Sequence, residues 1–232
     1  MIDDALYDYL MVDIQLLSDD GIIKVNITKK DEKYYTPFFV VKDYNFPKPT
    51  KMLTDFVEIT SNPFSYKIHA EGQPDKVLYE SDPTKLMVSK HFVIDKGKFS
   101  LDPDNKYPLM GLGQRKGPFY INSSGTHTLF TRASSQYDDG KLPGKNSYGA
   151  HPFYAYQTPN KKFMGVFNMN THAMDYILNF NGGTDTEMTN VMVGGFLWKY
   201  YFIGSGVDDV IKKYQSVVGK PFVPPMWSFG WH

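Results

Sequence analysis

Short segments in which apolar and polar residues alternate run through most of the chain, from residue 9 to residue 202. Such alternation is typical of β-strands that bury one face. Residues 12–16 and 22–28 alternate in this way on either side of Asp19-Asp20-Gly21, a turn sequence, and this arrangement predicts a β-hairpin. Further strands are predicted at residues 34–41, 54–60, 64–70, 76–80, 86–95, 107–112, 119–122, 126–131, 151–157, 163–170, 173–179 and 191–203.

Glycine pairs and one long polar segment interrupt this pattern. Gly182-Gly183 predicts a turn, whereas Gly194-Gly195 lies inside a predicted strand and is interpreted as a site of close strand packing. Residues 132–149 form a polar loop of a length that is unusual in compact domains. No linker divides the chain and no fixed repeat is present, so many short strands predict one large antiparallel β-sandwich.

The last part of the chain changes to a helical pattern. Apolar residues recur at helical spacing between residues 207 and 218, with Ser205 as the expected N-cap and Gly219 as the stop. Residues 222–232 then carry an aromatic run with strand-like content. The fold class expected is therefore mainly β, with one helix near the C-terminus.

Composition excludes several classes of function. The 232 residues include 25 basic and 25 acidic side chains, so the net charge of zero gives no footprint for nucleic acid or an anionic membrane. There is no cysteine, and the six histidines form no metal-ligand motif, so no metal or cofactor is expected. Residues 1–9 are acidic and lack an apolar segment, so we expect no signal peptide within them. If the front end of the protein is missing from this chain, a signal could be missing with it, and the compartment stays unknown.

Two tripeptides fit the sequence requirement for N-glycosylation. They are Asn26-Ile27-Thr28 and Asn122-Ser123-Ser124. Tripeptides as short as these also occur often by chance.

Several blocks, in order, are specific enough to indicate a family. They are Gly-Leu-Gly-Gln-Arg at 111–115, Thr-Leu-Phe-Thr-Arg at 128–132, Tyr-Gly-Ala-His-Pro-Phe-Tyr at 148–154, Gly-Val-Phe-Asn-Met-Asn-Thr-His-Ala-Met-Asp at 165–175, and Pro-Phe-Val-Pro-Pro-Met-Trp at 221–227. Together they resemble the N-terminal β-sandwich of glycoside hydrolase family 31, the family of lysosomal and intestinal α-glucosidases. The resemblance covers nearly the whole chain and implies a galactose-mutarotase-like super-sandwich.

The resemblance implies a division of the chain into three parts. Residues 1–204 would form the sandwich, 205–221 a connecting helix, and 222–232 the first strand of a truncated (β/α)8 catalytic barrel. The family's catalytic aspartates lie far into the barrel, so no catalytic residue is expected in this chain, which we expect to be inactive alone. The implied partners are that barrel and, through it, an α-glucoside or oligosaccharide.

One sandwich loop contributes to the sugar pocket in this family. It follows the strand that ends at the position of Arg132, where the family has Arg-Asp and this chain has Arg132-Ala133. The candidate substrate-binding residues are accordingly Arg132, Ser134, Ser135, Asp138 and Asp139. Asp138 or Asp139 could replace the missing carboxylate, or the second could simply begin a turn with Gly140.

Two further family positions bear on function. Gln114 stands where the family has Glu, which removes a charge and keeps a hydrogen-bond acceptor. His151 and His172 lie in family blocks and are expected to be hydrogen-bonded structural residues.

Two other classes of function remain to be weighed. One is a stand-alone carbohydrate-binding or scaffold sandwich. The other is an aldose mutarotase, which would need a His and a Glu for proton transfer, with Glu58, Glu71, Glu80 and Glu187 as the available carboxylates. None of these four lies in a block that resembles a mutarotase site, so this class is disfavoured.

Overall fold

The computed structural model describes ten stretches of the chain: residues 10–18, 21–29, 57–61, 64–70, 72–89, 91–104, 108–115, 117–131, 146–181 and 184–230. The strands are β1 (Leu10–Ser18), β2 (Ile22–Lys29), β3 (Val57–Ser61), β4 (Phe64–Ala70), β5 (Gln73–Ser81), β6 (Met87–Val88), β7 (Val93–Ser100), β8 (Leu109–Gly111), β9 (Tyr120–Ile121), β10 (Gly125–Leu129), β11 (Phe153–Gln157), β12 (Phe163–Asn168), β13 (Met174–Phe180), β14 (Asp185–Met192) and β15 (Leu197–Gly204). The helices are the α-helix α2 (Val207–Val218) and the short 3-10 helices η2 (Pro83–Lys85) and η3 (Met226–Phe229).

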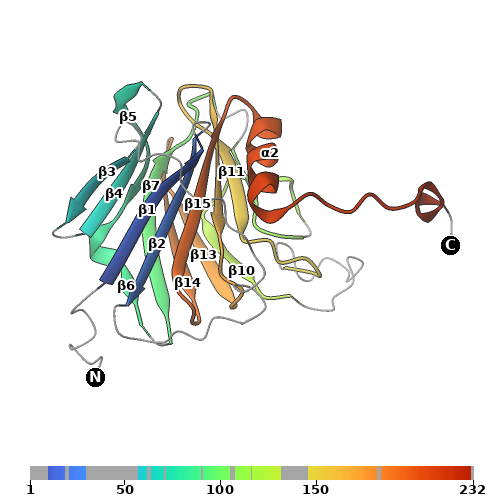
Figure 1. Ribbon diagram of the computed structural model, residues 1–232, viewed down its shortest axis with the longest axis horizontal. Coiled ribbons are helices and arrows are strands. Elements are labelled where there is room, and N and C mark those ends of the chain that lie inside the picture. Colours follow the sequence, from blue (N-terminus) through green and yellow to red (C-terminus); the bar gives the residue numbers. More distant parts are fainter. Residues whose placement is uncertain are drawn as a thin grey trace.

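Two antiparallel sheets pack face to face, as Figure 1 shows. The first sheet has the strand order β1-β2-β15-β12-β11-β8-β9, and the second has β10-β13-β14-β7-β5-β4-β3, with β6 paired to β7. The predicted β-sandwich is therefore confirmed. The predicted hairpin is also confirmed, since β1 and β2 pair antiparallel from Leu10 opposite Lys29 to Ser18 opposite Ile22.

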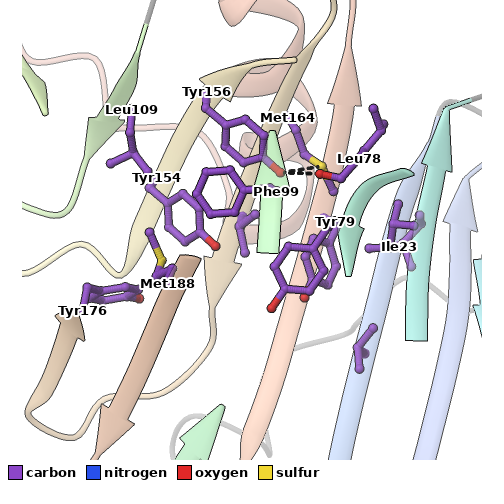
Figure 2. Close-up of a cluster of buried hydrophobic side chains, with 14 of the residues drawn as sticks. Ile23, Leu78, Tyr79, Phe99, Leu109, Tyr154, Tyr156, Met164, Tyr176 and Met188 are labelled. Atoms are coloured by element: carbon purple, nitrogen blue, oxygen red, sulfur yellow. Dashed lines mark hydrogen bonds between the residues drawn. The ribbon is translucent and has the colours of Figure 1, made fainter. Parts of the chain in front are cut away.

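The core between the sheets is rich in tyrosine. Tyr154, Tyr156 and Tyr176 are almost completely buried there (Figure 2). Phe99 stacks on Tyr156 with ring centroids 4.3 Å apart, and the Tyr156 hydroxyl donates to the Leu78 carbonyl at 3.0 Å. The Tyr176 hydroxyl likewise accepts from Asn168 Nδ2 at 2.9 Å, so hydrogen bonds compensate the burial of these two hydroxyl groups while the rings supply apolar area.

A buried ion pair joins the two sheets. Lys199 of β15 and Asp95 of β7 are 0% and 2% exposed and form a salt bridge. The carboxylate also accepts from Asn190 of β14 at 3.3 Å, and the Lys199 ammonium donates to the Tyr79 hydroxyl at 3.2 Å. A buried charge needs this complete set of partners, because desolvation of an unpaired ion is very costly.

Helix α2 covers the outer face of the first sheet. Its Val210 is completely buried, and a Cβ atom added at Gly165 or Gly204 would lie 2.5 Å or 2.9 Å from a Val210 methyl group. The two glycines thus make the hollow that receives Val210. Because the helix covers one face and the core covers the other, all eight residues of β15 are buried.

The single strand predicted at residues 191–203 is wrong. Residues 191–192 end β14, and β15 begins at Leu197. Between them, Gly194 and Gly195 have φ angles of +115° and +80°, which side chains other than glycine rarely adopt. These two glycines therefore serve a connection between strands. The predicted turn at Gly182-Gly183 and the predicted strand at 34–41 lie outside the described residues.

The C-terminal helix begins one residue later than predicted. Gly206, rather than Ser205, is the N-cap of α2, and Gly219 ends the helix as expected. The Ser205 amide instead donates to the Asp209 carboxylate at 3.0 Å.

Residues 226–229 form the 3-10 helix η3, not a strand. Pro224 and Pro225 have no amide hydrogen to give to a β-ladder, and Ser228 N donates back to the Pro225 carbonyl at 2.9 Å. The strand-like content of residues 222–232 is therefore not expressed as a strand at residues 226–229 in the structure of this chain. The division into sandwich, connecting helix and barrel strand stays a prediction.

Candidate functional site

A groove of about 520 Å³ opens at one edge of the sandwich, beside α2. Three connecting segments and one helical side chain line it: residues 129–131 at the end of β10, 150–152 before β11, 167–174 between β12 and β13, and Tyr214. The Tyr214 ring lies against Phe167 with centroids 5.3 Å apart, which joins the helix to this rim. Groups distant in the sequence thus converge on one hollow.

A hydrogen-bond network fixes the polar side of the groove. Asn170 is 8% exposed, and its Nδ2 donates to the carbonyl oxygen atoms of Gly194 at 3.0 Å and Phe196 at 3.3 Å. Its Oδ1 therefore faces the His172 ring, whose Nδ1 lies 3.1 Å away. Because an amide oxygen can only accept, His172 Nδ1 is the donor in this contact.

The histidine expectations are met in part. His172 is hydrogen-bonded, as predicted, and it also fills the space above Gly194, where an added Cβ would lie 3.0 Å from its ring. His151 lines the same groove and is exposed. The structural role expected for His151 stays a prediction.

The segment at 111–115 holds residues on both sides of the long loop. Gln114 Oε1 accepts from Gly149 N at 3.2 Å, and the Gln114 carbonyl accepts from Asn146 Nδ2, also at 3.2 Å. Arg115 donates to the carbonyl oxygen of Thr128 at 2.6 Å. Gln114 therefore does act as an acceptor, and an amide suffices there because its partner is a neutral backbone N–H.

Burial shifts the pKa values of two basic side chains beside this segment, Arg115 and His127. Burial lowers the pKa of Arg115 to about 10, so its guanidinium remains charged at neutral pH. Burial, and then the Arg115 charge, lower the pKa of His127 below its usual value. Both causes favour the neutral form of the His127 imidazole beside the Arg115 cation.

The five predicted substrate-binding residues cannot be placed in this site. Arg132, Ser134, Ser135, Asp138 and Asp139 all lie outside the described residues. The neighbouring described residue, Thr131, lines the groove. The assignment of these five residues to a sugar site stays a prediction.

The described lining of the groove differs from a glycoside-hydrolysing site. Such chemistry needs a pair of carboxyl groups on either side of the scissile bond. Among the described residues that line the groove, none is Asp or Glu. The lining offers an apolar wall with amide, imidazole and hydroxyl groups, a composition typical of a small-ligand site.

Two other kinds of site receive no support from the described stretches. No three or more His, Cys, Asp or Glu side chains there are grouped so that they could hold a metal ion. In the same stretches, no helix is long and apolar enough to cross a membrane.

Comparisons with known proteins identify relatives. Intestinal sucrase-isomaltase of Suncus murinus is 29% identical over 205 residues, which cover 86% of this chain and 10% of that protein. Lysosomal alpha-glucosidase of Rattus norvegicus is 35% identical over 125 residues, or 53% of this chain and 12% of that protein. No protein-family model matches the chain.

The fold has solved counterparts as well. A GH31 dextranase of Flavobacterium johnsoniae, solved with isomaltotriose, superposes with a TM-score of 0.65 and 16% identity. The match covers 97% of this chain and 29% of the dextranase. At this identity the match shows the shared fold.

The fold of this chain is the β-sandwich that is also present in the matched glycoside hydrolase structure. The chain is a relative of glycoside hydrolase family 31, in the α-glucosidase group. It spans about a tenth of the length of the sucrase-isomaltase and lysosomal α-glucosidase that it matches.

Proposed function

We propose that this chain is the N-terminal, non-catalytic sandwich domain of an α-glucosidase-like glycoside hydrolase that cleaves terminal α-glucosidic bonds. It would pack on a (β/α)8 catalytic domain and meet an α-glucoside or oligosaccharide through that barrel. The extent of the sequence match supports this, since 86% of the chain aligns with only 10% of sucrase-isomaltase. The remaining length of such a relative would hold the catalytic carboxylates.

The observation that carries the proposal is an exposed apolar segment after α2. Five large apolar side chains within eight residues are 71–87% exposed: Phe222, Val223, Met226, Trp227 and Phe229. In Figure 1 this segment extends away from the sandwich. A cluster of exposed apolar side chains of this kind marks an interaction site. We assign the segment to contact with the catalytic domain.

The division of labour follows from the chemistry of retaining hydrolysis. That reaction needs a nucleophilic carboxylate and an acid/base carboxyl about 5–5.5 Å apart. The family's two aspartates belong to the barrel, and barrel enzymes carry their catalytic groups on loops at the strand C-termini. The sandwich would then support and shape the sugar pocket, and hydrolysis by this chain alone is not expected.

The proposal predicts two properties of the purified chain. It should enhance the fluorescence of an apolar-surface dye, and it should not hydrolyse a nitrophenyl α-glucoside above the buffer blank. Changing Trp227 and Phe229 together to Ser should reduce the dye signal, whereas Ile177→Ser, an exposed residue within β13, should leave it nearly unchanged. A stable monomer that binds no dye, or a chain that hydrolyses the glucoside, would contradict the proposal.

The groove supports a second candidate, a stand-alone carbohydrate-binding sandwich. Phe130 lines the groove with 55% of its surface exposed, beside the polar edge formed by His172. An aromatic face next to hydrogen-bonding groups is the usual composition of a small-ligand site. Calorimetric titration of the chain with maltose separates the two candidates: saturable binding without a catalytic domain favours the stand-alone module.

A further inference from the structure

The connection between β9 and β10 presents an asparagine to solvent. Asn122, Ser123 and Ser124 make up this connection, and all three residues are exposed. They have the sequence Asn-X-Ser, which is the requirement for attachment of an N-linked glycan. We propose that Asn122 is an N-glycan acceptor.

The surrounding structure holds the connection in an accessible form. β9 is the edge strand of the first sheet and β10 is the edge strand of the second, so the three residues pass around the rim of the sandwich. The Ser124 hydroxyl accepts a hydrogen bond from the Phe180 amide at 2.9 Å. The serine is thereby tied to the body of the protein, while Asn122 lies outside both sheets.

The second tripeptide occupies a different environment. Asn26 lies within β2, where its register partners are Asp13 on β1 and Trp198 on β15. Its backbone is therefore inside the seven-stranded sheet, with a strand paired on either side. Glycans are bulky groups of surface loops, and a surface loop is what Asn122 offers and Asn26 does not. The structure therefore favours Asn122 over Asn26 as the glycosylated residue.

A glycan at Asn122 would leave the groove open. β10 runs from Gly125, next to the tripeptide, to Leu129, which lines the groove. Four strand steps separate these two residues, or about 14 Å at the usual rise of a strand. The attachment point is therefore at the opposite end of β10 from the groove. This inference does not depend on the proposed hydrolase role.

The modification step is chemically complete with one co-reactant, a lipid-pyrophosphate-linked oligosaccharide. A bond forms between Asn122 Nδ2 and the anomeric carbon of the first sugar. The bond from that carbon to the pyrophosphate oxygen breaks, the lipid pyrophosphate leaves with the electron pair, and the amide nitrogen loses one proton.

The test is secretion of the full chain from a eukaryotic host behind a cleaved leader, followed by intact mass measurement before and after peptide N-glycosidase treatment. We expect one enzyme-sensitive mass shift, lost entirely in Asn122→Gln and retained in Asn26→Gln. Ser124→Thr should keep the shift because it keeps the hydroxyl, and Ser124→Ala should lose it.

Peptide mapping of the unsubstituted chain locates the glycan without relying on how any variant folds. A glycan on the peptide that contains Asn122 supports the proposal. An unmodified secreted chain, a shift that survives Asn122→Gln, or a glycan mapped to Asn26 alone would overturn it.

Discussion

Replacing Lys199 by Met should lower the free energy of unfolding by about 3–5 kcal/mol, the usual cost of leaving one member of a buried ion pair alone. The substitution removes the cation that compensates Asp95, a residue only 2% exposed. Asn190 would remain as a hydrogen-bond donor to that carboxylate, at 3.3 Å, but it carries no charge. The two sheets would then enclose an uncompensated negative charge.

Urea unfolding followed by intrinsic fluorescence measures this loss. Lys98→Met is the matched control, because Lys98 is 53% exposed and pairs with Glu187 at the surface. We expect it to cost under about 1 kcal/mol. Adding Asp95→Asn to Lys199→Met should recover most of the lost stability, since both charges are then gone. A Lys199→Met chain as stable as the Lys98→Met control would refute a structural role for the pair.

Gly97→Ala should destabilise the protein by about 3 kcal/mol, at the upper end of the usual range for an overpacked core. A Cβ atom at position 97 would lie 2.1 Å from the Tyr79 hydroxyl oxygen and 2.2–2.4 Å from two of its ring carbons. Tyr79 cannot move aside easily, because it is 1% exposed and its ring centroid lies 5.0 Å from that of Tyr201. Its displacement would also break the hydrogen bond from Lys199.

The same unfolding measurement applies, with Gly206→Ala as control. A Cβ atom at Gly206 would meet nothing within 4 Å, so only a small loss of helix capping is expected there. If Gly97→Ala and Gly206→Ala proved equally stable, the core around Tyr79 would be looser than the structure indicates.

The sandwich was predictable because apolar residues occupy the buried positions of most strands, so the alternating pattern is visible in the sequence. β13 is an example: its buried residues Met174, Tyr176 and Leu178 alternate with partly or fully exposed ones, and all three carry large apolar groups. Most of strand β14 was not predicted, because its buried positions are not uniformly apolar. Its inward residues are Thr186, Met188, Asn190 and Met192, so half of its buried face is polar. Asn190 is stable there only because it hydrogen-bonds to Asp95, a contact that no local pattern reveals.

The groove could not be predicted, although the blocks that build it could be recognised. Its lining comes from segments between residues 129 and 214 that converge only in the folded chain. The role of Gln114 was predictable in kind, as an acceptor, but its partner Gly149 lies 35 residues away. The five candidate sugar-binding residues depend on the family resemblance, and the described residues do not test them.

The proposal that this chain is one domain of a family 31 glycosidase is tested most directly by sequencing its transcript through the codon for His232. We predict that the reading frame continues into a (β/α)8 barrel carrying the family's nucleophile segment, similar to Asp-Met-Asn-Glu. A stop codon directly after His232 would contradict this account, and the carbohydrate-binding sandwich would then be the function to test.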